Sequence, residues 1–206
     1  MGYLKVTGKA RKEYPCDVMH IKINFNSYSD NVSKAVESSV SECDQFLALL
    51  ENKGFDISSI QITYNSISHD FDDGKLEIHS GREIEIRLPF DMMILNEISD
   101  IIKEHGFKAE MDVTFKVSDL ISKHNVLLQE AVRNSKERAE LIAESMCHKI
   151  IGIDSLDTCG YDNNDSDEKE YFSKHSYKMG DNSISNKLRS PVSKEYVSVE
   201  VKWIID

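Results

Sequence analysis

Proline, glycine and cysteine are scarce in this chain. Its 206 residues include three prolines, nine glycines and four cysteines. No glycine-rich phosphate-binding loop occurs among the glycines, and the cysteines, at positions 16, 43, 147 and 159, show neither a CxxC pair nor zinc-type spacing. We therefore expect no cofactor and no metal. We also expect Cys43 and Cys147, which fall on predicted helices, to be buried thiols.

Long apolar runs and excess positive charge are also missing. No run of about 18 apolar residues occurs, so we expect no transmembrane segment. The N-terminus lacks a basic region followed by an apolar core, and the chain as given is predicted to be cytoplasmic. A periplasmic or envelope location would follow if a signal peptide had been removed. The net charge of −11 argues against nucleic-acid binding, because that affinity depends largely on Lys and Arg neutralising phosphates.

Sequence motifs of catalysis are absent too. The seven histidines form no HxxxH or HExxH pattern, and no GxSxG occurs. Acidic side chains gather at residues 69–73 and again at residues 162–168, but the spacing is not that of a calcium loop. We interpret these clusters as a hairpin tip and a solvated loop. We predict a protein that is not an enzyme; a hydrolase or metal site built from distant residues is a minor alternative.

Hydrophobic periodicity predicts an α+β fold. Apolar residues alternate with polar ones over residues 108–117 and again from Val197 to Trp203, as in half-buried strands. Helical spacing predicts helices near residues 30–53, 91–105 and 120–149. Together with strands at 13–28, 57–71 and 75–90, these give the order β-α-β-β-α-β, which is that of a ferredoxin-like antiparallel sheet with helices on one face.

Further elements extend this predicted core. They are a strand at residues 3–10, the long helix, a short strand at 150–158 and a C-terminal strand with Trp203 in the core. We treat residues 1–206 as a single domain.

The long helix carries small residues along one face. Ala131, Ser135, Ala139 and Ala143 recur every four positions, so a neighbouring surface can approach this face closely. One interpretation is that the helix packs tightly on the chain's own sheet. The other is a helix–helix contact in a homo-oligomer, with these four residues as the self-association surface.

Residues 160–195 show no lasting periodicity. They are rich in Asn, Asp, Ser and Lys, with isolated aromatic residues such as Tyr161 and Tyr171. A segment this polar buries too little apolar surface to fold alone. We predict a long mobile loop that is either disordered or a binding site for a protein partner.

Several segments resemble the SIMPL-domain family. The chain opens with Leu-Lys-Val-Thr-Gly-Lys-Ala at 4–10 and Pro-Cys-Asp at 15–17, and it closes with Val-Ser-Val-Glu-Val at 197–201. Between them, Ala-Val-Arg-Asn-Ser-Lys-Glu-Arg-Ala-Glu-Leu-Ile-Ala at 131–143 and Ile-Gly-Ile at 151–153 resemble the family's helix and exit. The likeness covers most of the chain in order and departs from the family in the 160–195 loop.

The resemblance implies an α+β fold based on the β-α-β-β-α-β order, and a role that is poorly defined. Some bacterial relatives are periplasmic or outer-membrane-associated antigens that form ring-like oligomers, and an animal relative is a signalling adaptor associated with a kinase. The family supplies no catalytic residues to carry over. We therefore predict a SIMPL-like protein that self-assembles or scaffolds partners. The alternative is a peptide or small-ligand binding module that uses an open sheet edge or face.

Overall fold

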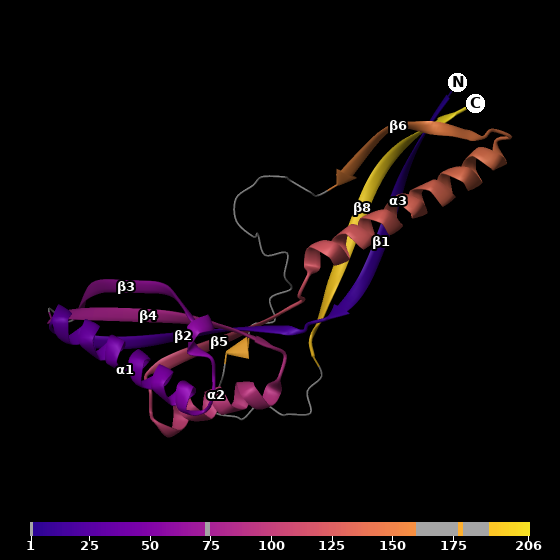
Figure 1. Cartoon of the computed structure of the whole chain (residues 1–206). Coiled ribbons are helices and arrows are strands. Elements are labelled where there is room, and N and C mark those ends of the chain that lie inside the picture. Colours follow the sequence, from indigo (N-terminus) through magenta and orange to yellow (C-terminus); the bar gives the residue numbers. More distant parts are fainter. Residues whose placement is uncertain (1, 73–74, 160–176, 179–189) are drawn as a thin grey trace. The chain divides into compact units, whose positions relative to one another are not determined.

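The computed structural model describes residues 2–72, 75–159, 177–178 and 190–206, and these fall into two compact units (Figure 1). The central unit comprises Cys16–Lys116 and Lys174–Pro191. The terminal unit comprises Met1–Pro15, Val117–Ser173 and Val192–Asp206, and so contains both ends of the chain. We predicted a single domain over residues 1–206. That the two units together form one domain stays a prediction.

The central unit has the predicted ferredoxin-like order. Its elements are β2 (Val18–Ser29), α1 (Val32–Asn52), a 3-10 turn η1 (Ile57–Ser59), β3 (Gln61–Asp72), β4 (Lys75–Pro89), α2 (Met92–Glu104), β5 (Ala109–Lys116) and β7 (Tyr177–Lys178). The sheet order is β3-β4-β2-β5-β7, and every pairing is antiparallel. Both helices lie on the same side of the sheet (Figure 1), which confirms the α+β prediction.

Local signals explain the helices of the central unit. The Asn31 side chain accepts a hydrogen bond from the Lys34 N–H and so caps α1, and Asp91 caps α2 in the same way through the Met93 N–H. Past the ends of these helices, Gly54 and Gly106 adopt φ angles of 91° and 66°, a conformation that glycine takes without strain. Between helices and sheet, the rings of Phe25, Phe46 and Phe107 stack edge to face or tilted, with centroids 5.4–6.2 Å apart.

The terminal unit joins the two ends of the chain in one sheet. It consists of β1 (Gly2–Pro15), α3 (Leu120–Ser145), β6 (Ile150–Cys159) and β8 (Val192–Ile205), with strand order β1-β8-β6. β1 and β8 are antiparallel and paired from Gly2–Ile205 to Pro15–Val192. α3 packs on β1 and β8, and Trp203 lies in the core between helix and sheet, as predicted.

The boundaries at the start of the chain differ from the predicted ones. β1 continues to Pro15 instead of ending near residue 10, because its whole length pairs with β8. The strand is interrupted at Cys16–Asp17, directly after Pro15, which has no N–H to donate to a hydrogen bond of the sheet. Residues 57–59 form the η1 turn rather than the start of a strand, since the Asp56 carboxylate accepts the Ser58 N–H.

Two further predictions need correction. α3 ends at Ser145, and Cys147 adopts a left-handed φ of 59° and is exposed, so it is not the buried helical thiol that we expected. The predicted 160–195 loop lies mostly outside the described residues. Within it, Tyr177–Lys178 pairs with β5, and the segment from Val192 onward belongs to β8 because it pairs with β1.

Candidate functional site

The small-residue face of α3 is buried against the chain's own sheet. Ala131, Ser135, Ala139 and Ala143 are all at most 1 % exposed. The Ser135 hydroxyl donates to the Val6 carbonyl at 3.1 Å and accepts from the Trp203 indole N–H at 3.1 Å. The first interpretation of this stripe, tight packing on its own sheet, therefore accounts for all four residues. A helix–helix contact between copies has no exposed surface to use there.

The glycine that makes this close packing possible lies in β1. A Cβ added at Gly8 would stand 2.0 Å from the Ala131 carbonyl oxygen and 2.7 Å from the Ser135 backbone nitrogen. Such a close approach of backbone to backbone requires the absence of a side chain. The sequence showed the small residues of α3, but it did not show that their partner lies far away along the chain, in β1.

α3 also protects the free edge of β1. The Lys9 N–H donates to the Asn134 side chain at 3.1 Å, and Arg138 donates to the Thr7 carbonyl at 2.7 Å. Edge strands with unpaired backbone groups invite association, and covering them is a common protection. The middle of the β1 edge is therefore already occupied by side chains of the same chain.

β6, at the other edge of this sheet, is less well covered. It pairs with β8 and has no second neighbouring strand in the described part of the chain. α3 barely touches it. Ile153 and Leu156 lie opposite Trp203 and Val201, on the helix side of the sheet. They are 50 % and 41 % exposed, whereas Trp203 is 4 % exposed.

We call Ile150, Ile153 and Leu156 the β6 strip. Ile150 lies opposite Ile205, which also faces the helix side. Irregularities between Ile150 and Gly152 and between Ile153 and Ser155 shift the register, so these residues share a face although they are three positions apart. A strict two-residue alternation along the sequence does not reveal such a surface.

Charged side chains accompany β6. Asp154 pairs with Lys202 at 2.9 Å. Asp157 is exposed and lies opposite Glu200, a like charge whose own ion pair is with Lys5 at 2.6 Å. Lys149 is exposed just before β6 begins. This edge therefore offers an acidic position near one end of the strand and a basic position at the other.

The central unit carries a polar network on the sheet face opposite its helices. Glu85 accepts hydrogen bonds from His20 at 2.9 Å and from Arg87 at 3.0 Å, and the His20 and Glu85 side chains are nearly buried. Burial and the nearby Lys116 cation lower the pKa of His20. Burial by itself raises the pKa of Glu85, but the hydrogen bonds from Arg87 and His20 bring it below its ordinary value. The network links β2 to β4.

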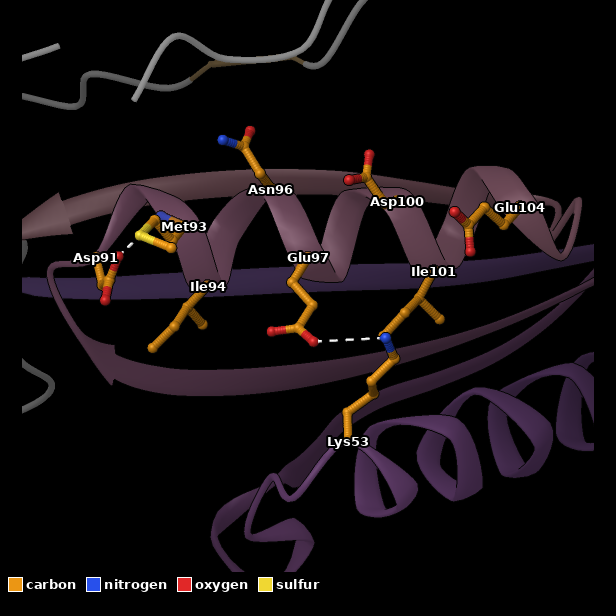
Figure 2. Close-up of a pocket in the computed structure, with 9 residues that line it drawn as sticks. All are labelled: Lys53, Asp91, Met93, Ile94, Asn96, Glu97, Asp100, Ile101 and Glu104. Atoms are coloured by element: carbon orange, nitrogen blue, oxygen red, sulfur yellow. Dashed lines mark hydrogen bonds and ion pairs between the residues drawn. The ribbon is translucent and has the colours of Figure 1, made fainter. Parts of the chain in front are cut away.

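A hollow of about 490 Å³ runs along α2 (Figure 2). It is lined by Lys53, Asp91, Met93, Ile94, Asn96, Glu97, Asp100, Ile101 and Glu104. Glu97 points toward Lys53, with which it pairs at 3.7 Å, while Asn96 and Asp100 point to the other side of the helix (Figure 2). Because these polar side chains point to opposite sides of α2, they do not converge on one small ligand.

The edge strand of the central sheet, β3, also exposes apolar side chains. Ile62, Tyr64 and Ile67 are each more than half exposed, and β3 pairs only with β4 among the described strands. This is the type of edge to which an extended peptide can add a strand.

The described residues also bear on metal binding and on membrane crossing. Among them, no group of three His, Cys, Asp or Glu side chains is placed to hold a metal ion. None of the described helices is long and apolar enough to cross a bilayer. The acidic residues at 162–168, which we interpreted as a solvated loop, lie outside the described part of the chain.

The arrangement defines an α+β protein with two units: in sequence, the main segment of a ferredoxin-like unit comes between β1 and α3 of a unit with a helix-backed, three-stranded sheet. The chain belongs to the SIMPL family. The family model, described as a protein of unknown function (DUF541), matches residues 4–203 and so runs through both units. This confirms the resemblance seen in the sequence. No curated protein matches the chain.

Proposed function

We propose that this SIMPL-family protein is not an enzyme and acts by self-assembly, as a scaffold made of several copies. The β6 strip is the observation that supports the proposal. Aliphatic side chains on the helix side of a sheet are normally covered, and here Ile153 and Leu156 keep about half of their surface in solvent. They lie on an edge strand, where backbone groups can add to the attraction.

The size of the effect indicates what kind of contact the strip can make. Full burial of an Ile or Leu side chain contributes about 2 kcal/mol, so covering the exposed halves of Ile153 and Leu156 in two copies contributes roughly 4 kcal/mol. Association itself costs about 4–15 kcal/mol. The strip therefore needs further contacts, such as strand pairing or ion pairs, to form a stable complex.

Light scattering over a concentration series tests the proposal. We expect a native mass that is a multiple of 23.5 kDa and falls on dilution. The double variant Ile153→Thr, Leu156→Thr should shift the equilibrium toward the monomer. Ile67→Thr, which removes an exposed aliphatic side chain from β3, is the matched control and should leave the mass unchanged. A wild-type chain that stays at 23.5 kDa at every concentration contradicts self-assembly.

A second candidate function rests on the β3 edge. A peptide-binding module would use the exposed Ile62, Tyr64 and Ile67 to hold alternate side chains of an added strand. Screening extended peptides by thermal shift would test this function. A shift that Ile67→Thr abolishes supports it, and the absence of any shift counts against it.

A further inference from the structure

We propose that two copies of the chain pair antiparallel through β6, with Ile153 of one copy opposite Ile153 of the other. The two three-stranded sheets then form one continuous sheet. The inference rests on the proposed self-assembly and names its contact. A two-fold axis normal to the sheet relates the copies, and it keeps both α3 helices on the same side.

The register follows from the symmetry of the β6 strip. In an antiparallel pair centred on Ile153, position 150 lies opposite position 156 of the second copy. Positions that lie opposite each other share a face of the sheet. Ile150, Ile153 and Leu156 all face the helix side, since they lie opposite the inward residues of β8. Pairing centred on Ile153 therefore brings Ile150 of each copy against Leu156 of the other, with the two Ile153 side chains opposite each other.

Charges at the two ends of β6 fit the same register. Position 157 comes opposite position 149, so Asp157 of each copy meets Lys149 of the other. Asp157 lies opposite Glu200 within its own sheet, where the like charge is unfavourable. Lys149 of the second copy approaches Asp157 from the side away from Glu200, and its positive charge relieves this repulsion. Two such pairs form in each interface.

The alternative of joining β6 to β1 of another copy is less favourable. The Thr7 carbonyl and the Lys9 N–H on β1 already bond to side chains of α3. Pairing there would first break these contacts. No such contact from α3 is seen on β6, which α3 barely touches in the described part of the chain. The isologous pairing of β6 uses the edge that has no neighbouring strand among the described residues.

A charge-swap series in the full-length chain tests the register. Asp157→Lys places a second cation opposite Lys149 of the other copy, and Lys149→Asp sets two acids opposite each other. Because an attraction becomes a repulsion at two places, we expect each single variant to weaken association about tenfold or more. The double variant restores opposite charges and should recover most of the wild-type affinity. Glu130→Lys on the exposed side of α3 changes the net charge as Asp157→Lys does and should have no effect.

Dissociation constants from light scattering or analytical ultracentrifugation, at low and high salt, give the readout. Both side chains are exposed, so circular dichroism should show all variants folded. Weakening by each single variant with recovery in the double variant supports the pairing. Single variants that assemble like the wild type, or a double variant that is not rescued, overturn this pairing while the proposed self-assembly stands. A monomeric wild type overturns both.

Discussion

Replacing Gly8 with alanine should separate α3 from its sheet. The new Cβ would lie 2.0 Å from the Ala131 carbonyl oxygen, and real Cβ contacts do not fall below 3.0 Å. The obstacle is the backbone of a helix interior, which cannot rotate away as a side chain can. The helix must therefore retreat by at least 1 Å at this point, from 2.0 to 3.0 Å.

The cost can be worked from the contacts that the retreat strains. Four hydrogen bonds join α3 to the sheet nearby: Ser135 with Val6, Ser135 with Trp203, Asn134 with Lys9 and Arg138 with Thr7. Each contributes about 1 kcal/mol, and overpacking alone costs about 1–3 kcal/mol. With partial relaxation we expect Gly8→Ala to lower the free energy of unfolding by about 3–5 kcal/mol. That is a large part of the ~5–15 kcal/mol typical of a native protein.

Chemical denaturation followed by tryptophan fluorescence measures this effect. The chain has a single tryptophan, Trp203, which lies buried at this contact and reports on it directly. Gly152→Ala is the matched control, because its Cβ would meet only the Ile204 side chain at an ordinary 3.5 Å. We expect that control to change the free energy of unfolding by less than about 1 kcal/mol. If Gly8→Ala were as stable as Gly152→Ala, the close approach of α3 to β1 would be refuted.

Two further predictions concern buried polar groups. Ser135→Ala leaves the Trp203 indole N–H without its acceptor, and we expect a loss of about 1–3 kcal/mol in the free energy of unfolding. A double-mutant cycle with Trp203→Phe should show that the two losses are not additive. Full additivity would contradict the contact. The lowered pKa of His20 means that the folded state binds the proton less readily than the unfolded chain does, so stability is full above the ordinary pKa of 6.5 and falls as the pH drops below it. Glu85, whose pKa is also lowered, stabilises the fold above its ordinary value of 4.5, and this contribution is lost as the pH falls through its folded pKa. Urea denaturation between pH 7.5 and about 5 should show a slope that His20→Gln reduces; an equal slope in that variant would assign the effect to other groups.

The elements that the sequence predicts well are those with regular periodicity and local end signals. β5 alternates without interruption, Asp91 and Gly106 bound α2, and Gly54 follows α1, all of them local signals. The order of these elements then leaves few ways to build an antiparallel sheet. This is why the ferredoxin-like arrangement of the central unit could be predicted before any coordinates were known.

The surfaces on which the proposals depend could not be predicted in the same way. The face of β6 depends on register shifts against β8, which no local pattern records. The role of the stripe in α3 depends on Gly8, and the end of β1 at Pro15 depends on pairing with β8. In each case the deciding partner lies in a distant part of the chain, so local propensity carries no information about it.

The exposed part of the β6 strip contributes little to folding. Its small effect on stability distinguishes side chains that serve an interface from side chains that pack in the core. Ile153 and Leu156 are largely outside the cover of α3, so replacing both with threonine, a good strand former, removes surface of which about half is already in contact with water. We expect the free energy of unfolding of the monomer to fall by about 1 kcal/mol, far less than the ~2–5 kcal/mol of a buried aliphatic truncation such as Leu127→Ala. Denaturation at concentrations where the wild type is dissociated makes the comparison. A loss in the double variant as large as that of Leu127→Ala would mean that the strip is part of the core, and any loss of assembly in that variant would then follow from unfolding.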